Sequence, residues 1–274
     1  MSTMEWTLDR SFDYEGDTIR YRVMGTGPDL VLVHGTPFSS YVWHRIAREA
    51  GRTWRIHVYD LLGYGQSTRR EGQDVSLAVQ DKVLAALLAH WRLDRPAIVG
   101  HDFGGATVLR AHLLDGCDFN RILLIDPVAI RPWGSPFVRH VRDHEAAFQG
   151  IPAYIHEAMV ARYLRGTMAR QISDAELAPY LSPWLGPVGQ PAFYRQIGQM
   201  DERFTDEVEA RLDTIRCPLS ILWGEDDGWI PVAQGARLQR MVPGSRLRIV
   251  PKAGHLLQED APEAVVAAIY DLGV

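Results

Sequence analysis

The sequence predicts an α/β fold: a mostly parallel twisted sheet flanked by helices, with a helical segment inserted into it. Short apolar runs alternate with longer segments of helical spacing. Several of these runs are apolar throughout, as expected for parallel strands covered on both faces. The alternation stops between about residues 129 and 212, where only helical stretches occur, and then resumes. Strand–helix alternation is typical of crossover units in a parallel sheet.

The individual elements follow from local patterns. The expected parallel strands are 29–34, 55–59, 96–100, 121–125, 219–223 and 247–250. Residues 7–14 and 18–23 flank a turn signal at 15–17, which predicts an antiparallel hairpin that leads into the sheet. Helical spacing covers 77–91 and 104–114, and a terminal helix is expected to start near Pro262.

The interruption of the strand–helix alternation divides the chain into two parts. Residues 1–128 and 213–274 are expected to form the core, and residues 129–212 a helical insertion that we call the cap. Helices within the cap are expected at 135–148, 154–165, 174–180 and 191–200. Ligands of open α/β sheets bind at the carboxyl ends of the strands. An insertion after a strand would therefore cover the site.

Composition limits the classes of function. The 274 residues carry a formal net charge of −5, which disfavours nucleic acid and anionic membranes as partners. The two cysteines, Cys117 and Cys217, suit neither a disulfide framework nor a metal site. The start at Met1–Trp6 shows no signal pattern, and no apolar stretch is long enough to span a membrane. We expect a cytoplasmic monomer or homodimer that needs no metal or organic cofactor.

The strongest local signal is Gly100-His101-Asp102-Phe103-Gly104, between an expected strand and an expected helix. This is the layout of a nucleophile elbow, G-x-S-x-G, with Asp in place of Ser. The small residues permit a tight turn that presents Asp102 above the sheet. An Asp before a helix can instead serve only as its N-terminal cap.

Two further loops follow expected strands. In His34-Gly35-Thr36-Pro37, the flexible Gly lets the N–H of Thr36 face the elbow. With the N–H of Phe103 it would form an oxyanion hole. In the second loop, Gly254-His255 lies before the terminal helix, and His255 follows the nucleophile in the order expected for this layout.

The acid that would orient His255 has two candidates. Asp227 follows the strand that ends at Trp223-Gly224, and its spacing from Gly224 matches the usual placement. Asp126 ends an earlier strand and is the alternative. Either carboxylate would orient the imidazole and stabilise its charged form.

Taken in order along the chain, these strand-end motifs resemble the α/β-hydrolase superfamily over essentially its whole length. Asp102 in the elbow resembles the branch of epoxide hydrolases and haloalkane dehalogenases. The resemblance implies an α/β-hydrolase fold with an inserted helical cap and an Asp–His–Asp triad. It also implies that Asp102 displaces a leaving group at an sp³ carbon. Water activated by His255 then hydrolyses the resulting aspartyl ester.

The leaving group separates the two families. Related dehalogenases hold a halide with Trp after the nucleophile and with Asn or a cap Trp, whereas this chain has Phe103 and Thr36. Cap candidates Trp133 and Trp184 remain for that alternative. Related epoxide hydrolases protonate the leaving oxygen with cap tyrosines, and Phe193-Tyr194-Arg195 resembles the segment that supplies one.

The resemblance therefore implies hydrolysis of a small apolar or mixed-polarity epoxide to a diol. Tyr194 is the expected acid, and Tyr154 or Tyr163 the second. Carbon–halogen hydrolysis is the first alternative. A non-catalytic protein that only binds a ligand in the same pocket is the second. An esterase is disfavoured because the elbow lacks Ser.

Overall fold

The computed structural model describes residues 6–273. Met1–Glu5, where the sequence shows no signal pattern, and Val274 lie outside the described residues. These residues are the two outer ends of the expected core. Within 6–273, no helix combines the length and the apolar character that crossing a membrane would require.

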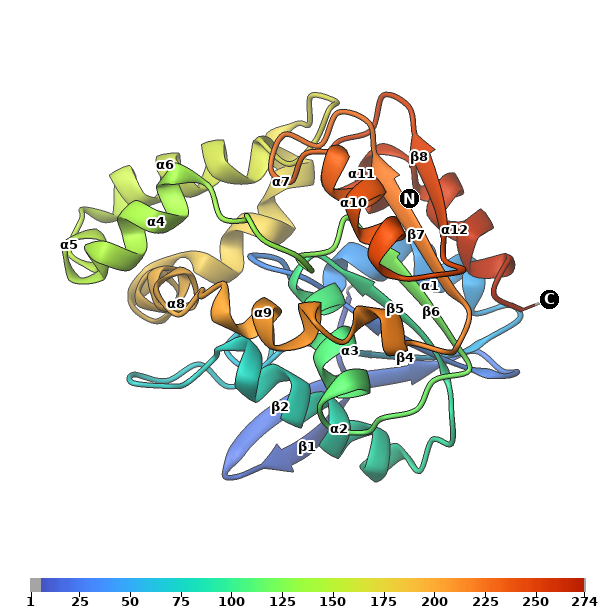
Figure 1. The fold of residues 1–274 in the computed structure, drawn as a ribbon. Helices are drawn as coiled ribbons and strands as arrows, with labels where there is room; N and C mark the ends of the chain where they lie inside the picture. Colours follow the sequence, from blue (N-terminus) through green and yellow to red (C-terminus); the bar gives the residue numbers. More distant parts are fainter. Residues whose placement is uncertain (1–5, 274) are drawn as a thin grey trace.

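An eight-stranded sheet, in the order β1-β2-β4-β3-β5-β6-β7-β8, lies at the centre of the described chain (Figure 1). Only β2 runs against its neighbours β1 and β4, and the other neighbouring strands pair in parallel. The predicted sheet and its leading hairpin are thus confirmed. The strands are β1 (Arg10–Tyr14), β2 (Asp17–Met24), β3 (Asp29–Val33), β4 (Arg55–Tyr59), β5 (Ala97–His101), β6 (Arg121–Ile125), β7 (Leu219–Gly224) and β8 (Arg246–Val250).

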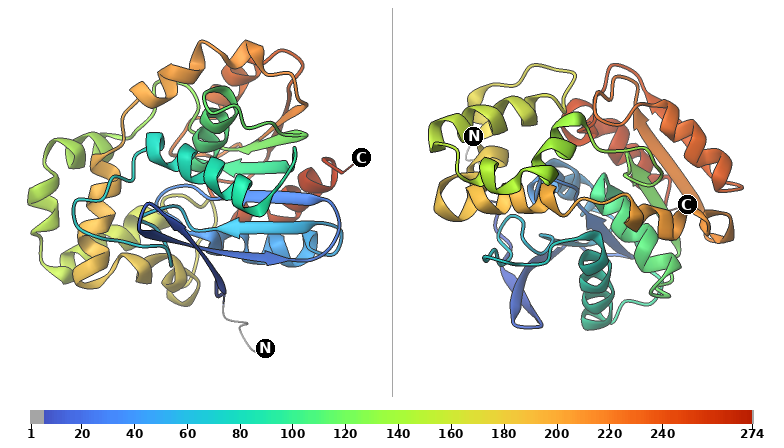
Figure 2. Two further views of the ribbon diagram at one scale, coloured as in Figure 1. Left: turned by 90° about the horizontal axis from the view of Figure 1, so that it is seen from below. Right: turned by 60° about the vertical axis from the view of Figure 1, so that its left-hand side comes forward.

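Helices cover both faces of the sheet (Figure 2). Helices α2 and α3 pack against each other on one face, and α1 and α12 pack against each other on the opposite face. Helices α1 and α10 were not predicted, because both are short and α10 buries only Gly235 and Leu238. The core helices are α1 (His44–Ala50), α2 (Leu77–Trp91), α3 (Phe103–Leu113), α10 (Ala233–Met241), α11 (Leu257–Asp260) and α12 (Pro262–Tyr270).

The parallel register brings the strand ends level. Val33 of β3 lies opposite Gly100 of β5, and Gly224 of β7 lies opposite Val250 of β8. The loops that follow these strands therefore leave the sheet at the same edge. This edge is where the sequence places its candidate residues.

Six α-helices lie between β6 and β7, in the stretch expected to form the cap. Figures 1 and 2 show α4, α5, α6 and α8 gathered at one end of the sheet. The single helix expected at 135–148 is divided, because His144 leaves the helical conformation at φ −137°. The cap helices are α4 (Pro136–Asp143), α5 (Glu145–Gln149), α6 (Ala153–Arg165), α7 (Asp174–Leu181), α8 (Gly186–Gly198) and α9 (Arg203–Glu209). Short 3-10 helices are η1 (Ser40–Trp43), η2 (Ser182–Trp184) and η3 (Leu212–Thr214).

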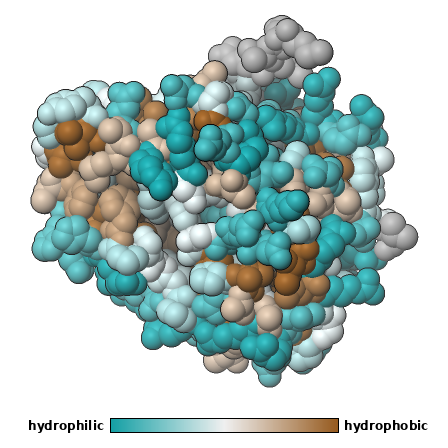
Figure 3. Space-filling model, turned by 90° about the horizontal axis from the view of Figure 1, so that it is seen from above, coloured by the Kyte–Doolittle hydropathy of each residue, from teal (hydrophilic) through white to brown (hydrophobic). Residues whose placement is uncertain are grey.

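The surface seen from above is hydrophilic over most of its area (Figure 3). Its apolar residues form several separate groups rather than one continuous face. Among the described residues, the large apolar side chains that are exposed are Tyr154, Ile155, Val188 and Ile249. Tyr154 and Ile155 lie in the first turn of α6, and Val188 lies in the first turn of α8. Three of the four exposed side chains are therefore on the cap.

Candidate active site

Asp102 occupies a sharp turn between β5 and α3. Its backbone has φ 51° and ψ −119°, an uncommon conformation for a residue with a side chain. A side chain at Gly104 would meet the carbonyl oxygen of Val33 at 2.3 Å, so only glycine permits this close approach. The Asp102 carboxylate makes no cap hydrogen bond to α3 and instead lines a cavity. Capping of the helix therefore does not explain this Asp.

The Thr36 loop holds one oxygen of this carboxylate. The N–H of Thr36 donates to Asp102 Oδ1 at 2.7 Å. A side chain at Gly35 would lie 2.5 Å from the same oxygen, so glycine is required here as well. The N–H of Phe103, the residue next to Asp102, stays a prediction as second donor. An N–H already aimed at Oδ1 is placed to stabilise charge that develops on that oxygen.

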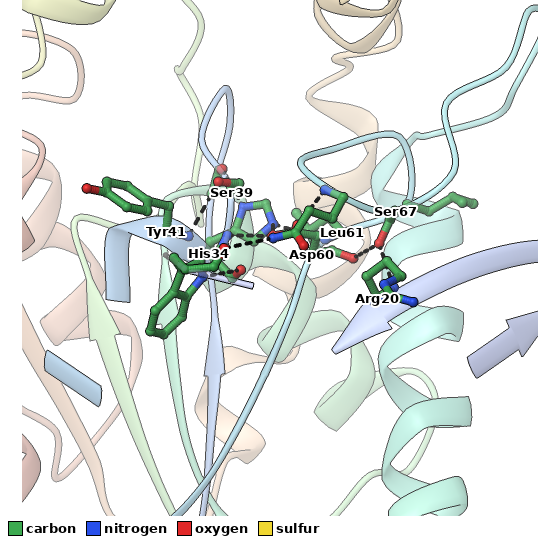
Figure 4. A network of polar contacts seen from close by, with 12 residues as sticks. Arg20, His34, Ser39, Tyr41, Asp60, Leu61 and Ser67 are labelled. Atoms are coloured by element: carbon green, nitrogen blue, oxygen red, sulfur yellow. Dashed lines mark hydrogen bonds and ion pairs between the residues drawn. The ribbon is translucent and has the colours of Figure 1, made fainter. Parts of the chain in front are cut away.

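A buried polar network holds the Thr36 loop (Figure 4). His34 Nε2 accepts the N–H of Leu61 at 2.9 Å, so Nδ1 carries the proton and donates to the carbonyl of Gly35 at 2.9 Å. Burial lowers the pKa of His34, which agrees with a neutral ring. Asp60 Oδ1 accepts the N–H of Ser40 at 2.7 Å. Asp60 and Leu61 thus have a structural role, since they bind residues on either side of Thr36.

His255 lies between the Asp102 and Asp227 carboxylates. Its Nε2 is 3.3 Å from Asp102 Oδ2, and its Nδ1 is 2.9 Å from Asp227 Oδ2. The N–H groups of Trp229 and Ile230 donate to Asp227 Oδ1 at 2.8 and 2.9 Å, which orients the carboxylate. The Trp229 indole stacks on the imidazole with ring centroids 5.3 Å apart. Nδ1 is thus held by an acid, and Nε2 faces the elbow.

Asp126 forms no hydrogen bond or ion pair with His255. Its Oδ1 accepts the N–H of Gly224 at 2.8 Å, and within residues 6–273 its Oδ2 has no hydrogen-bond partner. Burial, and after it the charge of Asp227, raises the pKa of Asp126 well above its usual value. A raised pKa means that Asp126 is the weaker of the two acids in stabilising an imidazolium ion. The geometry therefore favours Asp227 over the alternative acid.

Charge distribution in the site favours a protonated His255. Burial opposes the charged form, but Asp227 and then Asp102 outweigh it, so the pKa of His255 is raised well above 6.5. The ion pair with His255 lowers the pKa of Asp227 in spite of its burial. If Asp102 became an ester, its negative charge would disappear. The pKa of His255 would then fall, and its neutral form could act as a base.

The cavity above Asp102 is narrow and mostly apolar. Its volume is about 40 Å³, room for a few water molecules. Loops at the strand ends contribute Val128 and Ile230, and the cap contributes Trp133, Val138 and Met200. Such a lining favours a small apolar ligand over a charged one.

Residues 30–268 match the model of a family described as the alpha/beta hydrolase family. The chain belongs to the α/β hydrolase family. A crystal structure of an alpha/beta hydrolase fold protein from Burkholderia ambifaria is 53% identical, with a TM-score of 0.95 over 97% of this chain and 98% of that one. This degree of similarity extends through the cap as well as the core.

More distant relatives of the hydrolase include named dehalogenases. Haloalkane dehalogenase 2 from Mycobacterium tuberculosis is 28% identical over 96% of this chain and 93% of its own. A mutant haloalkane dehalogenase from Agrobacterium tumefaciens is 21% identical, with a TM-score of 0.80 over 97% of this chain and 96% of its own. At that identity the second likeness shows the fold alone.

The tyrosines of the hydrolase's cap differ in where they point. Tyr154 is 73% exposed, whereas Tyr163 of the same helix lines the cavity. They are nine residues apart, about two and a half helical turns, so they face opposite sides of α6. Tyr154 is therefore corrected to a surface residue. Burial, and after it the charge of Asp102, raises the pKa of Tyr163, which keeps its phenol protonated.

Tyr194 does not line the cavity either. Its hydroxyl is 2.9 Å from His156 Nδ1, and His156 Nε2 is 2.8 Å from the carbonyl of Trp184. The Phe193-Tyr194-Arg195 segment lies on α8 as expected, but the tyrosine faces α6. The expectation that Tyr194 donates to a ligand is thus corrected, because its hydroxyl is bound within the cap.

Gln196 is a residue that the sequence analysis missed. Its Oε1 accepts the hydroxyl of Thr36 and, at 3.1 Å, the hydroxyl of Tyr64. Two residues beyond Tyr194, it is rotated about 200° around α8 and so faces the core. Within residues 6–273 its buried Nε2 has no partner. The helical period of α8, read from Tyr194, was the signal that could have found it.

The cap tryptophans direct their N–H groups elsewhere. Trp133 lines the cavity with its ring, but its Nε1 donates to Thr205 Oγ1 at 2.9 Å. Trp184 is buried and donates to the carbonyl of Pro37 at 2.6 Å. Neither of these indoles presents a free N–H to a halide beside Asp102.

Proposed function

We propose that this α/β hydrolase opens small apolar epoxides to diols through an ester on Asp102. The observation that carries the proposal is the position of the Asp102 carboxylate. Its Oδ1 faces the N–H of Thr36, its Oδ2 faces His255, and both lie under an apolar cavity. A carboxylate nucleophile needs no base to attack carbon.

The first step forms the ester. Asp102 Oδ2 attacks an epoxide carbon, the ring C–O bond breaks, and the departing oxygen takes the phenol proton of Tyr163. Tyr163 suits this role because it lines the cavity and stays protonated. The product of the step is a hydroxyalkyl ester of Asp102. This step needs no N–H groups of the kind that hold a leaving halide.

The second step releases the diol. Neutral His255 takes a proton from water, and the hydroxide attacks the Asp102 carbonyl carbon. The N–H of Thr36 stabilises the charge on Oδ1, with that of Phe103 as the predicted second donor. The acyl C–O bond of the ester breaks, the leaving oxygen takes the second proton of the attacking water, and the diol departs as the Asp102 carboxylate forms again. The proton on His255 returns to the Tyr163 phenolate through solvent, so water plus epoxide gives diol.

Hydrolysis of a carbon–halogen bond is the second candidate, and the dehalogenase relative at 28% identity favours it. The same Asp102 and His255 would perform both steps, but a halide needs N–H donors rather than a proton. Phe103 and Thr36 offer no such side-chain donors, and the Trp133 indole N–H is bound to Thr205. Release of diol or of halide from styrene oxide and from matching bromoalkanes separates the two.

Replacing His255 with glutamine is expected to trap the ester. Glutamine cannot take a proton from water, so alkylation proceeds while hydrolysis stops. Intact mass spectrometry after incubation with styrene oxide should show one added substrate per chain, and peptide mapping should place it on Asp102. His112→Gln is the control, because His112 bonds to the carbonyl of Cys117 outside the site. A protein that only binds its ligand would form no adduct, and that result rejects the proposal.

Replacing Tyr163 with phenylalanine is expected to lower kcat/KM for epoxides about 100-fold or more, the usual contribution of a positioned acid. Activity toward a bromoalkane, which needs no proton, should change little. Tyr194→Phe is the matched control, because its hydroxyl serves the cap. Steady-state kinetics on both substrates check the prediction. Equal losses for Tyr163→Phe and Tyr194→Phe would contradict the role of Tyr163.

A further inference from the structure

The loop that carries His255 is joined to a segment of the cap. This segment, residues 167–170, lies in the connection between α6 and α7. The N–H of Leu256 donates to the carbonyl of Thr167 at 2.9 Å. A side chain at Gly254 would meet the carbonyl oxygen of Thr167 at 2.7 Å and the nitrogen of Ala169 at 2.9 Å. The two backbones therefore lie in direct contact.

Asp260 bridges these two backbones. Its Oδ2 accepts the N–H of Gly254 at 2.8 Å and the N–H of Ala169 at 2.7 Å, and its Oδ1 accepts the N–H of Arg170 at 3.3 Å. One carboxylate thus binds the residue before His255 and two residues of the cap. Hydrogen bonds from N–H groups to an ionised acceptor are stronger than neutral ones.

Glu259, the neighbour of Asp260, strengthens the same junction. It is buried and accepts the Tyr180 hydroxyl at 2.5 Å and Arg170 Nη2 at 3.0 Å. Tyr180 belongs to α7, so these contacts hold α11 to the cap. Asp260 therefore projects from a helix whose position is already restrained.

We propose that Asp260 is a positioning residue for the base: by bridging Gly254 to residues 169–170, it sets where His255 meets the water of the second step. The inference rests on the proposed function. Asp227 restrains Nδ1 of the ring, but it does not restrain the backbone that carries it. A displacement of about 1 Å can cost about 100-fold in rate, so this backbone contact affects catalysis.

The position of His255 affects only the step after alkylation. A change at Asp260 should therefore slow ester hydrolysis without slowing ester formation. In Asp260→Ala, we expect the rate of ester formation to stay within about threefold of wild type, while ester hydrolysis slows by about 100-fold. The ester on Asp102 should then accumulate during turnover. Asp260→Asn keeps the side chain's shape and one acceptor oxygen, so it should recover part of the hydrolysis rate.

Rapid-quench mass spectrometry with styrene oxide measures both steps in full-length protein. Asp174→Ala is the control, since Asp174 lies on the cap, pairs with Arg165 and is almost fully exposed. If Asp260→Ala does not fold, Asp260→Asn decides. Equal slowing of both steps, or no slowing, overturns the inference. If His255→Gln traps no ester, the proposed function fails instead. If it does trap one while Asp260→Ala hydrolyses the ester at the wild-type rate, only the inference fails.

Discussion

Replacement of Asp102 with alanine is expected to remove turnover, by at least about 10⁴-fold in kcat, because the attacking atom itself is lost. No other described carboxylate combines a hydrogen bond from Thr36 with a contact to His255. Diol and halide release should both disappear, and mass spectrometry should find no adduct even when His255 is also replaced. Both steps depend on this one side chain.

The control for this experiment is Asp226→Ala, an exposed acid of the loop that carries Asp227. It should keep turnover within about threefold of wild type, as expected for a surface substitution. Thermal unfolding of both variants tests whether the fold is retained. Strong turnover of any ester, epoxide or bromoalkane by Asp102→Ala would contradict the assignment of the nucleophile.

Replacement of Asp227 with asparagine is expected to slow ester hydrolysis by about 10³- to 10⁴-fold. The amide oxygen can still accept the N–H groups of Trp229 and Ile230, which turns the NH₂ toward His255 Nδ1. The imidazole would then carry its proton on Nε2 and could not take one from water. Alkylation needs no base, so the ester should accumulate in this variant.

The same substitution should lower the pKa of His255. Asp227 is the strongest of the groups that raise the pKa of His255, whereas burial lowers it. Without the charge of Asp227, the effect of burial is less well compensated and the pKa falls. NMR titration of the imidazole in wild type and variant measures the direction. An unchanged or raised pKa would show that Asp227 does not act on the ring as the geometry indicates.

Asp126→Asn provides the matched comparison at the alternative acid. The amide oxygen can accept the N–H of Gly224 as the carboxyl does, and no charge is lost if Asp126 is already neutral. We expect ester hydrolysis within about tenfold of wild type, a small loss beside that of a triad member. A loss as large as that of Asp227→Asn would reverse the choice between the two acids.

The order of elements followed from the sequence because hydrophobic spacing is a local property. The strands at 55–59 and 121–125 and the helix at 77–91 have the bounds that their patterns predict. Helix α1 was not predicted because its seven residues make too few turns to show a helical period of apolar residues. The division of the expected helix at His144 depends on how α4 and α5 pack, which no local pattern records.

The convergence of the strand-end residues could also be predicted. In a parallel sheet the carboxyl ends of neighbouring strands share an edge, so Asp102, Thr36, Asp227 and His255 had to emerge close together. The distances then distinguish between Asp227 and Asp126. The spacing of Asp227 from Gly224 already favoured it, but which of the two acids reaches His255 Nδ1 depends on the geometry of loops after three different strands, which the structure supplies.

The sequence by itself determined the family, the order of strands and helices, and the loops from which the chemistry comes. The tertiary structure decided which face of each cap helix is turned toward the core, placing Tyr163 rather than Tyr154 in the cavity beside Asp102 and Gln196 rather than Tyr194 against Thr36. The physical reason is the rotation of each cap helix about its own axis. That rotation is set by packing between segments far apart in the chain, whereas strand order and strand ends follow from patterns within a few residues.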